Sequence, residues 1–227
     1  MRNNKPLDAR LAAWLVYPLR NTSVTPNHLT TVRLCTGLGA CLLLAGGTPG
    51  LVNAGALCLA LSNFLDHTDG ELARMTGKTS NMGHYYDLAS DAAVNVLLFV
   101  GIGIGLRHGV LGSDALLLGL VAGVAVAATF QLRLLIGKLT GRFRVEQPGL
   151  GLFEIEDIFY LLPLVAFFSL LQPFLIIAAI GAPVFAVWTL VTYLRLTRVH
   201  TANTGAPMAA IMRNGCSRLK NATSGNR

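Results

Sequence analysis

The chain has 227 residues, of which 53% are hydrophobic and 13% charged, and its mean hydropathy is +0.56. This composition is too apolar for an ordinary soluble domain and indicates a polytopic membrane protein. The formal net charge is +7, but the basic residues are spread between hydrophobic segments and are not gathered in one stripe with aromatic side chains. The charge therefore favours membrane orientation and contacts with anionic lipid, and it argues against nucleic acid as a partner.

The first predicted element covers residues 7–18, where one helical face carries Leu7, Leu11, Trp14 and Leu15. This segment is too short to cross a bilayer, so we expect an interfacial amphipathic helix. An ordinary first helix packed on the bundle fits the pattern equally well, and Pro18 ends the helix in either case. Residues 1–28 are predicted to form a cytoplasmic N-terminus.

Six hydrophobic segments follow, and the last three are each near the roughly 20 residues that a bilayer core requires. They cover residues 29–46, 51–64, 83–106, 111–136, 155–171 and 174–194. Residues 29–198 are therefore predicted to form an all-α polytopic membrane domain with six transmembrane helices. Residues 199–227 are rich in Gly, Asn, Ser and basic side chains, and we expect a flexible basic cytoplasmic tail.

Four carboxylates lie where the second and third predicted spans meet, two after the end of the second span and two in the first turns of the third. Asp66 and Asp69 are three residues apart, and Asp87 and Asp91 are four apart, so on helices each pair projects from one face. The second span is expected to continue as a helix to Arg74, and only a short polar turn separates it from the third. Such an antiparallel hairpin would bring the two pairs together, as a cation shared between two helices requires.

Clustered carboxylates repel one another and lose hydration where apolar runs meet water, and a divalent cation relieves this cost. Oxygen ligands favour Mg²⁺, Mn²⁺ or Ca²⁺ over zinc. Gly70 and Ala73 continue the face of the first pair, and Gly83 lies one turn before Asp87, so side chains are missing where a ligand would approach. Arg74 adds a permanent cation with forked donors suited to phosphate oxygens.

The spacing D-x-x-D-G-x-x-A-R-x8-G-x-x-x-D-x-x-x-D is matched without a gap by Asp66, Asp69, Gly70, Ala73, Arg74, Gly83, Asp87 and Asp91. It resembles the signature of the CDP-alcohol phosphatidyltransferase family, membrane enzymes that build phospholipid head groups. A weaker resemblance links Asn27, Thr30 and Arg33 to the P-N-x-x-T-x-x-R opening common in that family. Most such residues are helix caps, and a supporting role near the nucleotide is the alternative.

The resemblance implies transfer of a phosphatidyl group from CDP-diacylglycerol to a small acceptor alcohol, with release of CMP. Asp66, Asp69 and Asp87 would be metal ligands. Asp91 would complete the metal site and act as the general base on the acceptor hydroxyl. The implied cofactor is Mg²⁺ or Mn²⁺, with two ions expected.

The resemblance also assigns the nucleotide site and the assembly. Gly70, Ala73 and Gly83 would let the cytidine nucleotide approach the backbone, and Arg74 would contact phosphate or hold the motif helix in place. The donor's lipid tails would need a lateral opening to membrane lipid. A homodimer is expected from the resemblance, although the Gly- and Ala-rich faces of spans three and four could equally pack inside a monomer.

The distribution of basic residues predicts the orientation. Six spans put both termini on one side, and of 18 Lys and Arg only Arg107 lies in the loops on the opposite side. By the positive-inside rule the side that carries the motif is cytoplasmic. We expect an integral protein of a bacterial or archaeal cytoplasmic membrane, with the active site and both termini in the cytoplasm.

Candidate contacts for the acceptor or for lipid phosphate are Arg133, Lys138, Arg142, Arg144 and Arg195. They are otherwise explained as topology determinants. Glu154 and Asp157 share a helix face and would either bind a cationic acceptor or pair with nearby arginines. The basic set favours a phosphorylated alcohol and the acidic pair an uncharged or amine-bearing one. The acceptor is left open, with a slight preference for a non-phosphorylated alcohol.

Three other functions are compatible with parts of the sequence. A CDP-linked head group could be passed to diacylglycerol, which reverses the roles of donor and acceptor. A cation transporter would explain intramembrane carboxylates but not the missing side chains or Arg74, and it would need the carboxylates deep in mid-span. A hydrolase would use His67 or His84 as metal ligands, whereas the matched motif supplies all ligands without histidine.

Overall fold

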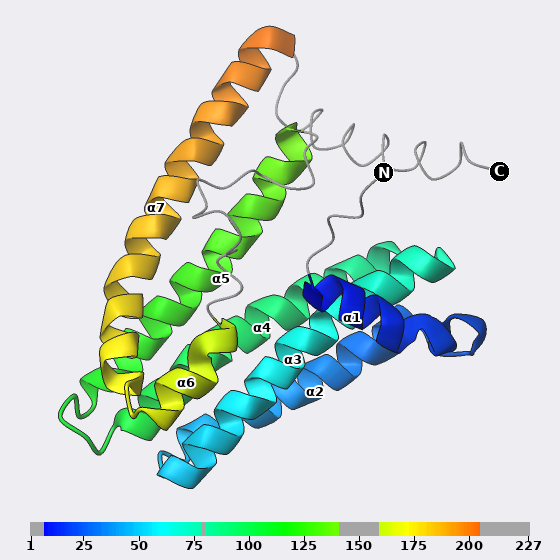
Figure 1. Cartoon of the computed structure of the whole chain (residues 1–227). Helices are drawn as coiled ribbons and strands as arrows, with labels where there is room; N and C mark the ends of the chain where they lie inside the picture. Colours follow the sequence, from blue (N-terminus) through cyan, green and yellow to red (C-terminus); the bar gives the residue numbers. More distant parts are fainter. Residues whose placement is uncertain (1–6, 79, 141–158, 205–227) are drawn as a thin grey trace.

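The computed structural model describes residues 7–78, 80–140 and 159–204. Every regular element in these ranges is helical, as Figure 1 shows. The elements are α1 Leu7–Val16, the 3-10 helix η1 Tyr17–Asn21, α2 Pro26–Ala45, α3 Pro49–Thr76, α4 Asn81–Leu106, α5 Asp114–Thr140, α6 Leu162–Phe167 and α7 Leu171–Thr204. The predicted all-α class is confirmed.

Four helices in the described ranges are long and apolar enough to cross a membrane. The qualifying segments are Pro26–Ala45, Met82–Leu106, Asp114–Gly137 and Leu171–Val199. They belong to α2, α4, α5 and α7 and agree with the first, third, fourth and sixth predicted spans. Helix α3 is also long, but Asn53, Ser62 and Asn63 interrupt its apolar run before the acidic motif begins.

The region of the predicted fifth span, 155–171, differs from the expectation in its described part. Helix α6 has six residues and ends at Phe167, and α7 begins at Leu171, three residues before the predicted start of the sixth span. Pro163 opens α6, where a missing N–H is tolerated. Helix α7 then continues to Thr204, past the predicted start of the tail at 199. Six spans therefore stay a prediction.

The turn between α3 and α4 is fixed by glycine and serine chemistry. Helix α3 ends at Thr76, and Gly77, which caps it, adopts a left-handed conformation with φ of 65°. The hydroxyl of Ser80 accepts a 2.9 Å hydrogen bond from the backbone N–H of Gly83 and caps the start of α4. The connection reverses the chain direction, but α3 and α4 do not pack against each other as a paired hairpin, because α2 packs against both.

Helix α2 is the neighbour that both motif helices share. It packs against α3 and α4, while α5 packs against α4 and α7, and α1 and α6 lie on α3 (Figure 1). Small residues permit the close approach of backbones. A Cβ atom at Gly101 would lie 2.5 Å from the Cys41 carbonyl oxygen of α2, and one at Gly119 would lie 2.3 Å from the Phe99 carbonyl oxygen. These glycines therefore serve packing within the chain.

Helix α1 packs on α3 through small side chains and leaves large ones outside. Ala12 and Val16 are buried, whereas Leu11, Trp14 and Leu15 are 58%, 77% and 46% exposed. The large apolar side chains thus point away from the bundle, as an interfacial helix would need. The helix ends at Val16, two residues before Pro18, which lies in η1.

Candidate active site

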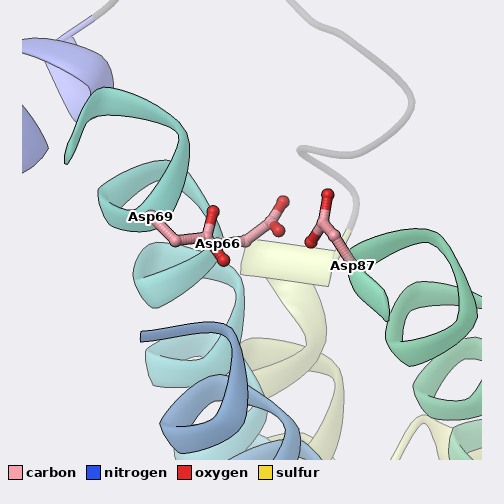
Figure 2. Close-up of side chains that lie close together, drawn as sticks. All are labelled: Asp66, Asp69 and Asp87. Atoms are coloured by element: carbon pink, nitrogen blue, oxygen red, sulfur yellow. The ribbon is translucent and has the colours of Figure 1, made fainter. Parts of the chain in front are cut away.

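Three carboxylates from two helices converge at the end of the motif hairpin. Asp66 and Asp69 project from α3 and Asp87 from α4, and one oxygen of each lies within 4.8 Å of the others (Figure 2). We call these three residues the aspartate triad. The predicted meeting of the two helices' carboxylates is confirmed for three of the four residues, and Asp91 is not in the converging group.

The first turns of α2 bind one member of the triad. The hydroxyl of Thr30 lies 2.7 Å from Oδ2 of Asp69, and both side chains are buried. Thr30 is in the second turn of α2 after Pro26, in the segment with the weaker resemblance to a family opening. The contact shows that α2 is part of the site and not merely a neighbour of it.

A buried arginine lies among the carboxylates. Nη1 of Arg33 is 2.9 Å from Oδ1 of Asp66 and 3.2 Å from Oδ1 of Asp87, and Nη2 pairs with Oδ1 of Asp91. The Arg33 side chain is 7% exposed, whereas these three carboxylates are about one third exposed. Sequence reasoning treated Arg33 as a supporting residue and missed this central position. The available signal was a lone arginine one turn beyond Thr30 in an apolar span.

Asp91 lies beside the triad and is joined to it through Arg33. It is one turn beyond Asp87 on α4, but it is not in the group whose oxygens converge. Its side chain is 32% exposed, so an acceptor alcohol could reach it from solvent. Asp91, which the family resemblance assigns to the metal site as well as to proton transfer, is thus separate from the three converging carboxylates, a position that suits a proton acceptor beside them.

The triad carries more negative charge than its surroundings favour. Burial raises the pKa of Asp69 to about 7; the hydrogen bond from Thr30 opposes this shift, and repulsion by Asp66 and Asp87 adds to it. Asp69 lies beyond the apolar run of α3. Three converging carboxylate oxygens are a donor set that suits Mg²⁺ or Mn²⁺. A bound cation would favour the ionised form of Asp69, whose pKa is raised without it. The residues present therefore fit a divalent cation.

The two motif glycines have different surroundings. A Cβ atom at Gly70 would meet only Nη2 of Arg74, at 3.5 Å, so this position borders open space. A Cβ atom at Gly83 would lie 2.6 Å from Oδ1 of Asn27 and 3.0 Å from the hydroxyl oxygen of Ser80. Gly70 leaves room for a ligand, and Gly83 leaves room for Asn27.

Arg74 is held by its own helix. Its Nε donates to the carbonyl oxygen of Gly70 over 3.2 Å, and its Nη2 lies 3.3 Å from Oε1 of Glu71. Arg74 is 66% exposed while Glu71 is 2% exposed. These contacts are of the kind expected if Arg74 holds the motif helix in place. The exposed guanidinium can still contact a phosphate. Glu71 occupies a variable position of the motif, so no spacing signal identified it.

The predicted acceptor residues are only partly described. Arg133 on α5 is half-buried, with its guanidinium carbon 5.3 Å from the centre of the Phe185 ring of α7. Arg195 on α7 is exposed, and Lys138 lies in α5. Arg142, Arg144, Glu154 and Asp157 fall outside the described residues. Both described arginines thus belong to the α5–α7 pair, on helices other than those that carry the triad.

The histidines of the motif make contacts of other kinds. Nδ1 of His67 lies 2.9 Å from the Asn63 carbonyl oxygen of its own helix. His84 is exposed, and its ring is 6.1 Å from that of Tyr85. The next residue, Tyr86, has its hydroxyl 3.0 Å from that of Thr31, which joins α4 to α2 near the triad.

Comparisons with known proteins identify the family of this chain. The family model for CDP-alcohol phosphatidyltransferase matches residues 23–194. An archaetidylinositol phosphate synthase from Pyrococcus horikoshii is 33% identical over 94 residues, which cover 38% of this chain and 45% of that protein. The match therefore spans less than half of the curated relative.

A solved structure shows the same fold over nearly its whole length. It is the crystal structure of Mycobacterium tuberculosis phosphatidylinositol phosphate synthase with CDP-DAG bound, with a TM-score of 0.55 and 18% sequence identity. The likeness covers 86% of this chain and 94% of that one. Because the family model covers most of the chain, including the whole aspartate motif, the protein belongs to the CDP-alcohol phosphatidyltransferase family.

Proposed function

We propose that this protein transfers a phosphatidyl group from CDP-diacylglycerol to the hydroxyl group of a small alcohol and releases CMP. The observation that carries the proposal is the convergence of the aspartate triad, within 4.8 Å, in a chain of this family. The solved relative of the same fold has CDP-DAG bound, which supports the choice of donor. Because the chain belongs to a family of transferases, we favour this reaction over the cation-transporter alternative.

The reaction requires one phosphorus–oxygen bond to form and another to break. The acceptor oxygen bonds to the phosphorus that carries diacylglycerol, and the bond from this phosphorus to the oxygen retained by CMP breaks. Bound Mg²⁺ or Mn²⁺, with two ions proposed, would offset the negative charge that develops on CMP. Asp66, Asp69 and Asp87 would hold the ions. Asp91 would take the proton of the acceptor hydroxyl, a contribution of about 10²–10⁴-fold.

Two features support a nucleotide beside the triad. Gly70 lies one residue after Asp69 and borders open space, so a flat base or ribose can approach the α3 backbone there. The guanidinium of Arg74 is exposed beside it and can reach a phosphate oxygen. Ala73 would share the open face, while Gly83 would act through its contact with Asn27.

We propose that the site faces the cytoplasm at the end of the membrane spans. Arg107 is at the far end of α4 from Asp87, so the positive-inside argument puts the triad on the cytoplasmic side. Helix α3 and the chain around α6 would complete six spans with α2, α4, α5 and α7. Helix α1 would lie in the interface, because its large apolar side chains face away from the bundle. From the family resemblance we also propose that the protein forms a homodimer.

An inositol phosphate is the first acceptor to test. Both relatives are named as synthases of inositol phosphate lipids. A phosphorylated acceptor needs a cation near the site, and Arg133 and Arg195 offer two on the α5–α7 pair. The acidic pair Glu154 and Asp157, which favoured a non-phosphorylated alcohol, lies outside the described residues.

The proposal is tested by measuring CMP release by the purified protein in detergent. CDP-diacylglycerol and Mn²⁺ are supplied with one acceptor at a time: inositol phosphate, glycerol phosphate, inositol, serine, choline or ethanolamine. We expect release with one acceptor and none from an Asp66→Asn variant. Release only when a CDP-linked head group is supplied with diacylglycerol would assign the reverse arrangement, and no release under either condition would contradict the proposal.

A further inference from the structure

Arg33 places a permanent positive charge where the proposed divalent cations would bind. We propose that Arg33 is an internal counter-cation of the aspartate triad: it neutralises the carboxylates in the metal-free protein and withdraws from them when metal binds. Metal binding is then an exchange of one cation for another. This inference rests on the metal site of the proposed function, and it assigns to a residue of α2 control over the affinity of that site.

Arg33 and a bound ion would compete for the same carboxylates. Nη1 lies 2.9 Å from Asp66 and 3.2 Å from Asp87, so it uses oxygens from both helices that an ion would bridge. An ion held at the usual metal–oxygen distance of about 2.0–2.2 Å would lie only a few ångströms from Nη1. Positive charges that close repel strongly in a partly buried site. In the proposed exchange the guanidinium therefore leaves Asp66 and Asp87 as the ion becomes coordinated.

The backbone of Arg33 is fixed, so only its side chain is free to make this change. Its carbonyl oxygen accepts hydrogen bonds from Ser62 of α3 at 3.0 Å and from Thr36 at 2.8 Å. One turn further on, a Cβ atom at Gly37 would lie 2.8 Å from the Val94 side chain of α4. Helix α2 is thus wedged between α3 and α4 at this level. The contact of Nη2 with Asp91 can persist, because Asp91 is outside the triad.

The burial of Arg33 gives the exchange its energetic basis. A guanidinium that is 7% exposed has lost most of its hydration and depends on the carboxylates for compensation. The carboxylates in turn repel one another when no cation is present. Loss of the Arg33 charge should therefore weaken the metal-free protein and strengthen metal binding. A residue that merely supported the bound metal would have the opposite effect on affinity.

The test is a Mn²⁺ titration of the purified full-length protein in detergent without substrate, with free Mn²⁺ measured by electron paramagnetic resonance. In Arg33→Gln we expect Mn²⁺ affinity to rise by about tenfold or more, because a nearby positive charge is lost. The melting temperature without metal should fall, and the increase on adding Mn²⁺ should exceed that of the wild type. The matched control is Lys78→Gln, which removes an exposed charge from the α3–α4 turn; its affinity should stay within about twofold of the wild type.

A second variant keeps the test valid if Arg33→Gln does not fold. Arg33→Lys retains one charge but lacks the fork that reaches Asp66, Asp87 and Asp91 together, so its Mn²⁺ affinity should exceed that of the wild type by a smaller factor. If the wild type binds Mn²⁺ and either variant binds it equally or more weakly, the exchange is overturned, while the proposed metal site is still supported. No binding by wild type and variants overturns both.

Discussion

Thr30 on α2 donates a 2.7 Å hydrogen bond to Oδ2 of Asp69 on α3, and both residues are buried, at 3% and 6% exposure. The bond favours the ionised carboxylate and so opposes the burial that raises the pKa of Asp69 to about 7. One residue of α2 thereby adjusts the charge of a proposed metal ligand on another helix.

Replacing Thr30 with valine should weaken metal binding. The Thr30→Val side chain has nearly the same shape but no donor, so the pKa of Asp69 rises further and less of the carboxylate is ionised at neutral pH. A lost bond to a buried charged group corresponds to about tenfold or more in affinity. A Mn²⁺ titration at pH 7 measures this. Thr129→Val is the matched control, because the buried hydroxyl of Thr129 donates only to the Ala125 carbonyl oxygen of its own helix. Equal Mn²⁺ affinities of the two variants would contradict the prediction.

The stabilisation that metal provides should depend on pH. The pKa of Asp69 is about 7 in the folded metal-free protein, against the ordinary value of 3.8. The folded state holds this proton more tightly, so the associated stability is present below about pH 4 and is lost as the pH rises through 7. A metal ion needs the ionised carboxylate, so its stabilising effect has the opposite dependence.

Melting temperatures with and without Mn²⁺ at about pH 6, 7 and 8 check this expectation. The increase caused by Mn²⁺ should be smallest near pH 6 and largest near pH 8. An Asp69→Asn variant has no proton to lose at this position and should show a smaller and flatter response. An increase in the wild type that is independent of pH would contradict the assignment of Asp69 as a ligand.

Asp69 and Asp91 should fail in different ways when each is changed to asparagine. Asp91 lies outside the triad, so Asp91→Asn should abolish CMP release while metal-dependent nucleotide binding stays largely intact. Asp69→Asn removes a member of the triad and should weaken both. Binding of a labelled CDP-diacylglycerol analogue, measured beside CMP release, separates the two effects. Equal loss of binding in the two variants would argue against a separate proton acceptor.

The two motif glycines should also differ in the effect of alanine. Gly83→Ala places a methyl group 2.6 Å from Asn27 and should lower stability by about 1–3 kcal/mol. Gly70→Ala meets only the flexible end of Arg74, so stability should hold or rise by up to about 1 kcal/mol. If the nucleotide approaches α3 at Gly70, the Gly70→Ala variant should be stable but should have a higher KM for CDP-diacylglycerol. Thermal unfolding and steady-state kinetics of both variants test the contrast, and a Gly70→Ala enzyme with unchanged KM would move the nucleotide elsewhere.

The acidic site was predictable because its signal is local. The spacing within each helix fixes which carboxylates share a face, and the short turn at Gly77 reverses the chain, so the sequence predicted the meeting of Asp66, Asp69 and Asp87. It did not predict that α2 packs against both motif helices. The all-α membrane character followed in the same way from long apolar runs.

The contribution of α2 was not predictable, because it depends on packing between distant segments. Arg33 is separated by 33 residues or more from the carboxylates that it contacts, and its spacing from Thr30 is equally typical of a helix cap. The sequence likewise does not reveal that the side chain of Asn27 lies beside Gly83, which was predicted to leave room for a nucleotide. The break between α6 and α7 was also misplaced, since apolar residues on both sides conceal where one helix ends.

The most direct test of the account is CMP release from CDP-diacylglycerol, with inositol phosphate as acceptor, measured with added Mn²⁺ and again after removal of divalent ions with EDTA. We predict release with Mn²⁺, complete loss with EDTA, recovery when Mn²⁺ or Mg²⁺ is restored, and no release from Asp87→Asn under any of these conditions. Release that persists in EDTA, or that survives in Asp87→Asn, would contradict a metal-dependent transferase built on the aspartate triad.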